Sequence, residues 1–362
     1  MAQPEHLANE PAAGTPQRVG WVDAAKGIGI LLVVLGHNQV NSYLPIFHLL
    51  VFSFHMPLFF LLAGMFFKPE YGLWTLAKRR FFSTLRPYLL AIVLIYATSL
   101  FFTTQPIVTV VTRALKSIFY SLPIYLDTWI PLWFLPHLFL VSLFVWVVFR
   151  LVYVRLGPLW LRLAFLGAML LAGVLALGLT AKINLILPAK LTLRGGLPWS
   201  ADLLLITGAF FLGGYELRRS LPERLLASWW TPLVCGALWL GLCLVFPYQL
   251  DLAGRRYDFF AVTTLELLAA CLMVFSLSYH LEKAGNRLFR WLSYLGRVSI
   301  VVLIFHGPIQ FFTFYKVMDL VSNAPIAASI AFLAGVGVPL IICETLLRGN
   351  PRLAGWFGLA VE

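Results

Sequence analysis

The chain has 362 residues, of which 60% are hydrophobic and only 12% are charged, and its formal net charge is +12. A soluble domain carries about 25% charged residues, so this composition excludes a water-soluble surface and indicates an integral membrane protein. The basic balance fits the excess of Lys and Arg that membrane proteins carry in cytoplasmic loops. No basic run is interleaved with exposed aromatic residues, which argues against a nucleic-acid partner.

The polar, Pro- and Ala-rich residues 1–20 are predicted to form a disordered cytoplasmic tail, because they lack the apolar core of a signal peptide. Beyond them, a membrane-spanning helix needs about 20 mostly apolar residues. The sequence predicts an all-α, polytopic fold with about ten such helices, at residues 27–44, 46–67, 87–104, 130–150, 159–180, 201–217, 229–247, 259–280, 294–315 and 324–347.

The charges between the predicted spans give an orientation. With the N-terminus inside, more than two-thirds of the Lys and Arg residues fall on the inner side, as the positive-inside rule requires. Both termini are therefore predicted to be cytoplasmic. Residues 21–350 are expected to form one transmembrane domain, followed by a cytoplasmic C-terminal tail at 351–362.

Polar residues lie in and directly before the first predicted span, in the segment WVDAAKGIGILLVVLGHNQV. Lys26 and His37 are 11 residues apart, which places them on one helix face about 16 Å apart along the axis. Asp23 lies near Lys26 at the inner edge, and Asn41 continues the face beyond His37. Polar groups at membrane depth are costly and usually functional, although an anchoring lysine or a packing histidine remains an alternative.

Two further histidines share a local pattern. His55 and His306 each stand two residues before a proline, Pro57 and Pro308, at the middle or outer half of a predicted span. A proline can kink a helix and open space beside the histidine. Neutral histidine is well suited to general-base chemistry, so His37, His55 and His306 are the candidate catalytic residues.

The remaining candidates are charged. Glu266 lies in the middle of the eighth predicted span, where it could pair with a histidine or a lysine, or contribute to an acceptor site together with Asn41. Arg79, Arg80 and Arg86 lie in the second inner loop and form a candidate phosphate site. No residue set has metal-ligand spacing, so no metal is expected.

The segments WVDAAKGIGILLVVLGH, FHMPLFFLLAGMFF, PLWFLPHLFL and LGRVSIVVLIFHGPI occur in this order along the chain. Together they resemble the membrane acyltransferase type-3 family, and within it the fucose 4-O-acetylase-like branch. The resemblance implies a multi-pass enzyme of the bacterial inner membrane that moves an acyl group, usually acetyl from acetyl-CoA, to a hydroxyl of a cell-envelope glycan. Lys26 stands where relatives commonly carry an arginine.

The resemblance suggests roles for the candidates. The donor would be held at the inner side by Lys26 and Asp23 with Arg79, Arg80 or Arg86, and no cofactor would be permanently bound. His37 would act as a general base or carry the acyl group, and the residues do not decide between these roles. The acceptor, the length of the acyl group and the oligomeric state stay open.

Two alternatives belong to other classes of protein. Intramembrane His, Lys and Glu residues also suit a proton-coupled secondary transporter or a glycan flippase, for which an inverted repeat would be diagnostic. A membrane-embedded assembly subunit without catalysis would leave the alignment of Lys26 with His37 unexplained.

Overall fold

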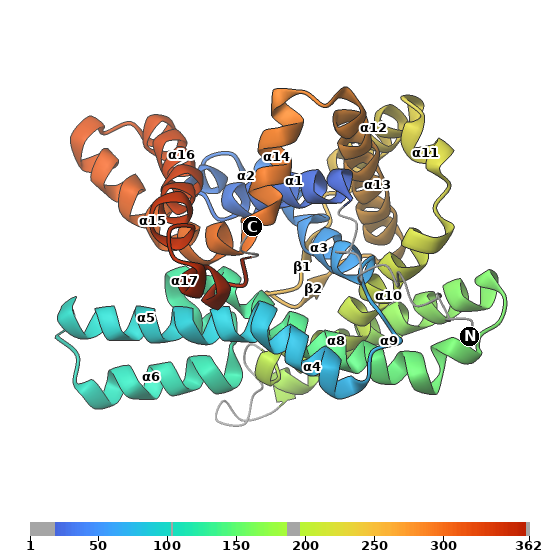
Figure 1. The fold of residues 1–362 in the computed structure, drawn as a ribbon, viewed down its shortest axis with the longest axis horizontal. Helices are drawn as coiled ribbons and strands as arrows, with labels where there is room; N and C mark the ends of the chain where they lie inside the picture. The colour runs from blue at the N-terminus through green and yellow to red at the C-terminus, as the bar shows by residue number, and fades with distance from the viewer. Residues whose placement is uncertain (1–18, 103, 187–195, 360–362) are drawn as a thin grey trace, which may run out of the picture.

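In the computed structural model, which describes residues 19–102, 104–186 and 196–359, the protein is a bundle of helices with one short β-hairpin (Figure 1). Eight of the described helices are long and apolar enough to cross a membrane, and α12 is a shorter apolar helix. This confirms the all-α, multi-pass membrane fold. The count of ten spans and the cytoplasmic termini stay predictions, and residues 1–18 of the expected N-terminal tail lie outside the described residues.

Helix α1 (Gly20–Gly36) occupies the middle of one half of the molecule. It lies between a pair formed by α12 (Trp230–Val245) and α13 (Phe260–Ala284) and a pair formed by α15 (Ser299–Val321) and α16 (Ala324–Ile342) (Figure 1). Small residues let α1 approach its neighbours closely, as is common where membrane helices pack.

The second predicted span is two helices, α2 (Pro45–Phe52) and α3 (His55–Gly64). The break lies at Ser53 and Phe54, about one turn before Pro57. Because Pro57 has no backbone N–H, the carbonyl of Ser53 cannot receive the usual helical bond from it. The proline thus separates two helices, and His55 becomes the first residue of the second one.

The ninth predicted span, 294–315, differs from the structure in the same way. Helix α14 (Arg287–Arg297) is a separate amphipathic helix packed against α1, and α15 starts only at Ser299. Val298 between them has a non-helical conformation, with φ −101° and ψ 10°. Residues 294–297 of the predicted span therefore belong to α14, and the membrane-spanning helix begins at Ser299.

The basic segment before the third predicted span is helical rather than a loop. Helix α4 (Leu73–Arg80) continues through a π-helical turn, η2 (Phe81–Leu85), into α5 (Arg86–Phe102), so this span begins earlier than residue 87. Helix α6 (Ile107–Tyr120) runs alongside α5 (Figure 1).

The other elements complete the bundle around these helices. They are η1 (Gln39–Ser42), α7 (Pro123–Leu126), η3 (Asp127–Trp133), α8 (Phe134–Leu151), η4 (Tyr153–Arg155), α9 (Leu159–Ile186), η5 (Pro198–Leu203), α10 (Leu204–Ser220), α11 (Glu223–Ala227), β1 (Leu250–Asp251), β2 (Arg256–Tyr257), η6 (Cys343–Leu347) and α17 (Pro351–Trp356).

The segment expected to be a C-terminal tail is packed on the bundle as far as it is described. Arg86 donates a hydrogen bond to the carbonyl of Gly355 in α17, and its guanidinium lies 5.5 Å from the ring centroid of Trp356. Phe357 is buried and contacts the ring of Phe305. Residues 360–362 lie outside the described residues.

Candidate active site

A cavity of about 420 Å³ lies beside α1, between the broken α2–α3 segment, η3, α8 and the start of α15. Its lining is mostly apolar, and its polar groups fall into three sets along α1. Lys26 lies toward the N-terminal end of this helix, His37 closes its C-terminal end, and Asp251 lies beyond, on the β-hairpin. Lys26 and His37 are 11 positions apart, which corresponds to about 16 Å along a helix axis.

One end of the cavity, the basic end, is lined by three cations: Lys26, Arg80 and Arg297. Lys26 Nζ is 3.4 Å from Asp23 Oδ1, so this charge is partly compensated. Within the described residues, neither Arg80 nor Arg297 has a carboxylate at ion-pair distance. The basic end therefore carries an excess of positive charge that favours an anion.

Of the three predicted arginines, Arg80 lines the cavity. Arg80, at the end of α4, lines it together with Ser83 and Thr84, and Thr84 Oγ1 donates a 2.7 Å hydrogen bond to the carbonyl of Arg80. Arg79 instead stacks 4.5 Å from the ring centroid of Tyr71, and Arg86 is bound to α17. The structure does not bring Arg79 or Arg86 to the cavity.

The three candidate histidines lie close together, with His37 and His55 beside Phe52 and His306 beside His37. The ring centroids of His37 and His306 are 5.8 Å apart, and Phe52 lies 6.2 Å from His37 and 4.7 Å from His55. His48 stacks on Phe52, with the ring centroids 3.9 Å apart. His37 and His55 line the cavity, whereas His306 is fully buried behind His37.

Hydrogen bonds define which ring nitrogen donates in two of these histidines. Nδ1 of His55 lies 2.9 Å from the carbonyl oxygen of Val51, and Nδ1 of His306 lies 2.8 Å from that of Val302. A carbonyl oxygen only accepts, so each Nδ1 donates its N–H, and in the neutral imidazole each Nε2 then offers a lone pair. Nε2 of His306 is buried without a partner among the described residues.

Two amides that the sequence analysis did not single out hold α1 against α15. Asn38 Nδ2 donates to Gln310 Oε1 at 2.7 Å and to the carbonyl of Ala328 at 3.0 Å, and Gln310 Nε2 donates to the carbonyl of Val34 at 3.0 Å. Gln310 lies one helical turn after His306, and Asn38 directly follows His37. Both amides lie close in sequence to a candidate histidine within an apolar segment, and this proximity is the sequence signal that could have identified them.

Asn41 and Glu266 do not line the cavity. Asn41 Nδ2 donates to the carbonyls of Leu35 and Gly36, so it caps the end of α1 that carries His37. Glu266 is 1% exposed on α13, and neither carboxylate oxygen has a hydrogen-bond partner among the described residues. Within the described residues, no group of three His, Cys, Asp or Glu side chains is arranged to hold a metal ion.

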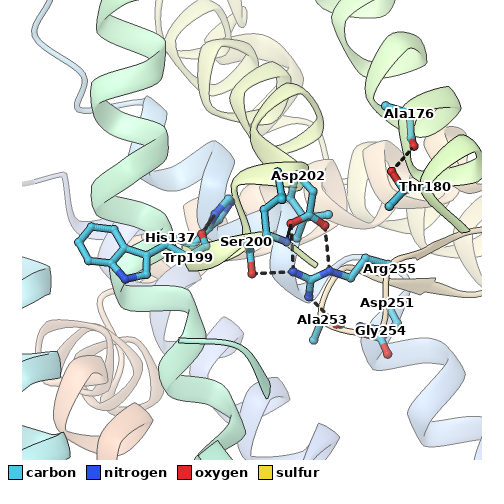
Figure 2. Close-up of polar contacts among 12 residues, drawn as sticks. His137, Ala176, Thr180, Trp199, Ser200, Asp202, Asp251, Ala253, Gly254 and Arg255 are labelled. Atoms are coloured by element: carbon cyan, nitrogen blue, oxygen red, sulfur yellow. Dashed lines mark hydrogen bonds and ion pairs between the residues drawn. The ribbon is translucent and has the colours of Figure 1, made fainter. Parts of the chain in front are cut away.

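The far end of the cavity is covered by the β-hairpin, which Arg255 fastens to η5. Figure 2 shows its guanidinium between Ser200 and Asp202, with bonds of 2.9 Å to Ser200 Oγ and 3.0 Å to Asp202 Oδ2. The carbonyl of Trp199, in the same turn, lies 2.9 Å from Nδ1 of His137 on α8 (Figure 2). These contacts fix the hairpin that carries Asp251 and Ala253, both of which line the cavity.

The fold and the cavity define a multi-pass membrane protein with a basic pocket at one end of a histidine-lined chamber. Residues 19–344 match the model of the acyltransferase domain of the type-3 family, and the chain belongs to this family. No curated protein and no solved structure matches the chain. The family makes the protein a membrane acyltransferase, which agrees with the resemblance drawn from the sequence.

Proposed function

We propose that the protein is an O-acetyltransferase that moves the acetyl group of acetyl-CoA to a hydroxyl of a cell-envelope glycan at the bacterial inner membrane, as in the fucose 4-O-acetylase-like branch. The observation that carries this proposal is the order of groups along one cavity. Two cations without an ion pair among the described residues, Arg80 and Arg297, lie with Lys26 at one end, and the imidazoles of His37 and His55 lie deeper. Coenzyme A is a polyanion with a long thin arm, and such a molecule suits a basic mouth that leads into a narrow apolar chamber.

The donor would be held at the basic end. Arg80 offers a planar guanidinium for phosphate oxygens, and Lys26 adds a point charge that Asp23 positions. Arg297 extends the site from α14. The thioester arm then follows the apolar lining toward His37, which is about 16 Å deeper along α1.

The reaction joins donor and acceptor at His37. As a general base, its imidazole takes the proton of the acceptor hydroxyl while the oxygen attacks the thioester carbonyl, the C–O bond forms and the C–S bond breaks. The thiolate of coenzyme A leaves and receives the proton. His306 lies close enough behind His37 to orient its ring, and His55 completes the polar wall of the chamber.

The experiment compares cell-envelope glycans by mass spectrometry in cells with and without the protein, and measures acetyl-CoA binding by calorimetry. We expect an added mass of one acetyl group only with the protein. Arg80→Gln should weaken acetyl-CoA binding by about 10- to 100-fold, because it removes charge-assisted hydrogen bonds. Arg79→Gln is the matched control, since this neighbouring arginine lies outside the cavity. An unchanged glycan, or a wild-type protein that does not bind acetyl-CoA, contradicts the proposal.

A further inference from the structure

The charges of the cavity are separated between its two ends. Its three cations lie at the basic end, whereas Asp251 on the β-hairpin is the one carboxylate among the described lining residues. Asp251 is also near enough to His48 to interact with it electrostatically, which places the carboxylate on the histidine side of the chamber. An anion would therefore be attracted to one end and repelled from the other.

The two arginines near Asp251 in the hairpin form ion pairs with other carboxylates. Arg255 is bound to Asp202, and Arg256 is 2.8 Å from Asp258. Within the described residues, Asp251 itself has no ion pair. Its negative charge is thus not cancelled by its neighbours and faces the cavity.

The carboxylate is held in place before any ligand arrives. The backbone N–H of Gly254 donates a 2.9 Å hydrogen bond to Asp251 Oδ1, and the antiparallel register pairs Asp251 with Arg256. Arg255 closes the loop through a 2.8 Å bond to the carbonyl of Ala253, and it adopts a left-handed backbone conformation with φ +58°. A side chain held this firmly loses little entropy when it binds a ligand.

We infer that Asp251 forms the acceptor subsite of the cavity, and that this subsite takes a sugar ring that is rich in hydroxyls and uncharged next to the reacting hydroxyl. The inference rests on the proposed acyl transfer and adds the class of acceptor. A carboxylate accepts hydrogen bonds from two or more hydroxyls, and these are stronger than bonds between neutral groups. The same carboxylate repels a uronic acid or a phosphorylated sugar, so it selects by charge as well as by shape.

The test uses purified full-length protein with acetyl-CoA and two sets of probes, methyl glycosides of neutral hexoses and of the corresponding uronic acids. Release of coenzyme A reports turnover, and equilibrium dialysis of the radiolabelled glycosides reports binding. We expect neutral glycosides to bind and to accelerate release, and uronides to do neither. Asp251→Asn should raise the acceptor KM by about 10- to 100-fold, with the acetyl-CoA KM unchanged.

The control is Asp258→Asn, because Asp258 belongs to the same hairpin but is paired with Arg256 outside the cavity lining. This variant should keep the wild-type preference, whereas Asp251→Lys should favour uronides over neutral glycosides. Equal acceptor KM values for wild type and Asp251→Asn overturn the inference, as does a wild-type protein that binds acetyl-CoA but no neutral glycoside. Failure to bind acetyl-CoA at all instead contradicts the proposed function.

Discussion

At the scale of single residues, His37 is the side chain on which the proposed chemistry depends. It ends α1, lines the cavity and lies beside His306, while Asn41 caps the helix end behind it. The buried pair Asn38 and Gln310 fixes the same helix end to α15. The position of the His37 backbone is therefore fixed by contacts that the His37 imidazole does not make.

We expect His37→Ala to lower the rate of acyl transfer by about 10²- to 10⁴-fold, the usual contribution of a general base. Folding should be retained, because the polar contacts that hold the end of α1 are made by other residues. Initial rates of coenzyme A release measure the loss, and the thermal unfolding midpoint checks folding. His280→Ala is the control, since His280 stacks on Trp229 outside the cavity.

The same variant separates the two roles left open for His37. Labelled acetyl-CoA without an acceptor should leave label on the wild-type protein, and none on His37→Ala, only if His37 carries the acyl group. A folded His37→Ala protein that transfers acetyl at the wild-type rate would make His37 a packing residue.

The sequence predicts the position of some residues of the candidate site but not of others. Helical periodicity predicts that Lys26 and His37 share a face, and both side chains line one cavity. The π-helical turn that separates Arg80 from Arg86 has no comparable signal in the sequence. The position of Asp251 could not be predicted from the sequence either, because it depends on a contact between Arg255 and Asp202, which are 53 residues apart.

At the scale of helices, the junction of α1 and α14 shapes the basic end. A Cβ atom at Gly296 would overlap the backbone carbonyl of Asp23, so the two backbones pack in direct contact. This contact brings Arg297 to the same mouth as Lys26. Helix α14 packs along α1 and ends at Val298, a tertiary contact that hydropathy does not report, so the predicted ninth span includes the last four residues of α14, 294–297.

Gly296→Ala should therefore damage donor binding. A methyl group that meets backbone atoms cannot be accommodated by a rotamer change, and such overpacking costs about 1–3 kcal/mol. We expect a lower thermal unfolding midpoint and a higher KM for acetyl-CoA. Gly337→Ala is the matched control, because no atom lies within 4 Å of a Cβ there. Equal stability and KM for the two variants would show that α14 is not held by backbone contact.

At the scale of the whole molecule, the basic end and Asp251 belong to one cavity, and α1 lines this cavity from Lys26 to His37. The all-α, multi-pass type of fold follows from composition, since apolar segments long enough to span a bilayer are visible in the sequence, whereas the count of ten spans stays a prediction. Hydropathy does not reveal the helix breaks in the second and ninth predicted spans. The break in the second span can be explained afterwards, because Pro57 has no backbone N–H to continue the helix. The first break lies beside His55, and the second lies beside Arg297 at the basic end.

The central claim is that donor and acceptor meet inside this cavity after entering from opposite ends. The measurement uses sealed proteoliposomes with neutral methyl glycosides enclosed and radiolabelled acetyl-CoA added only outside. The account predicts labelled acetyl glycoside inside vesicles of the wild-type protein and none inside those of His37→Ala. Acetyl glycoside that forms only when both reactants are on the same side would contradict it.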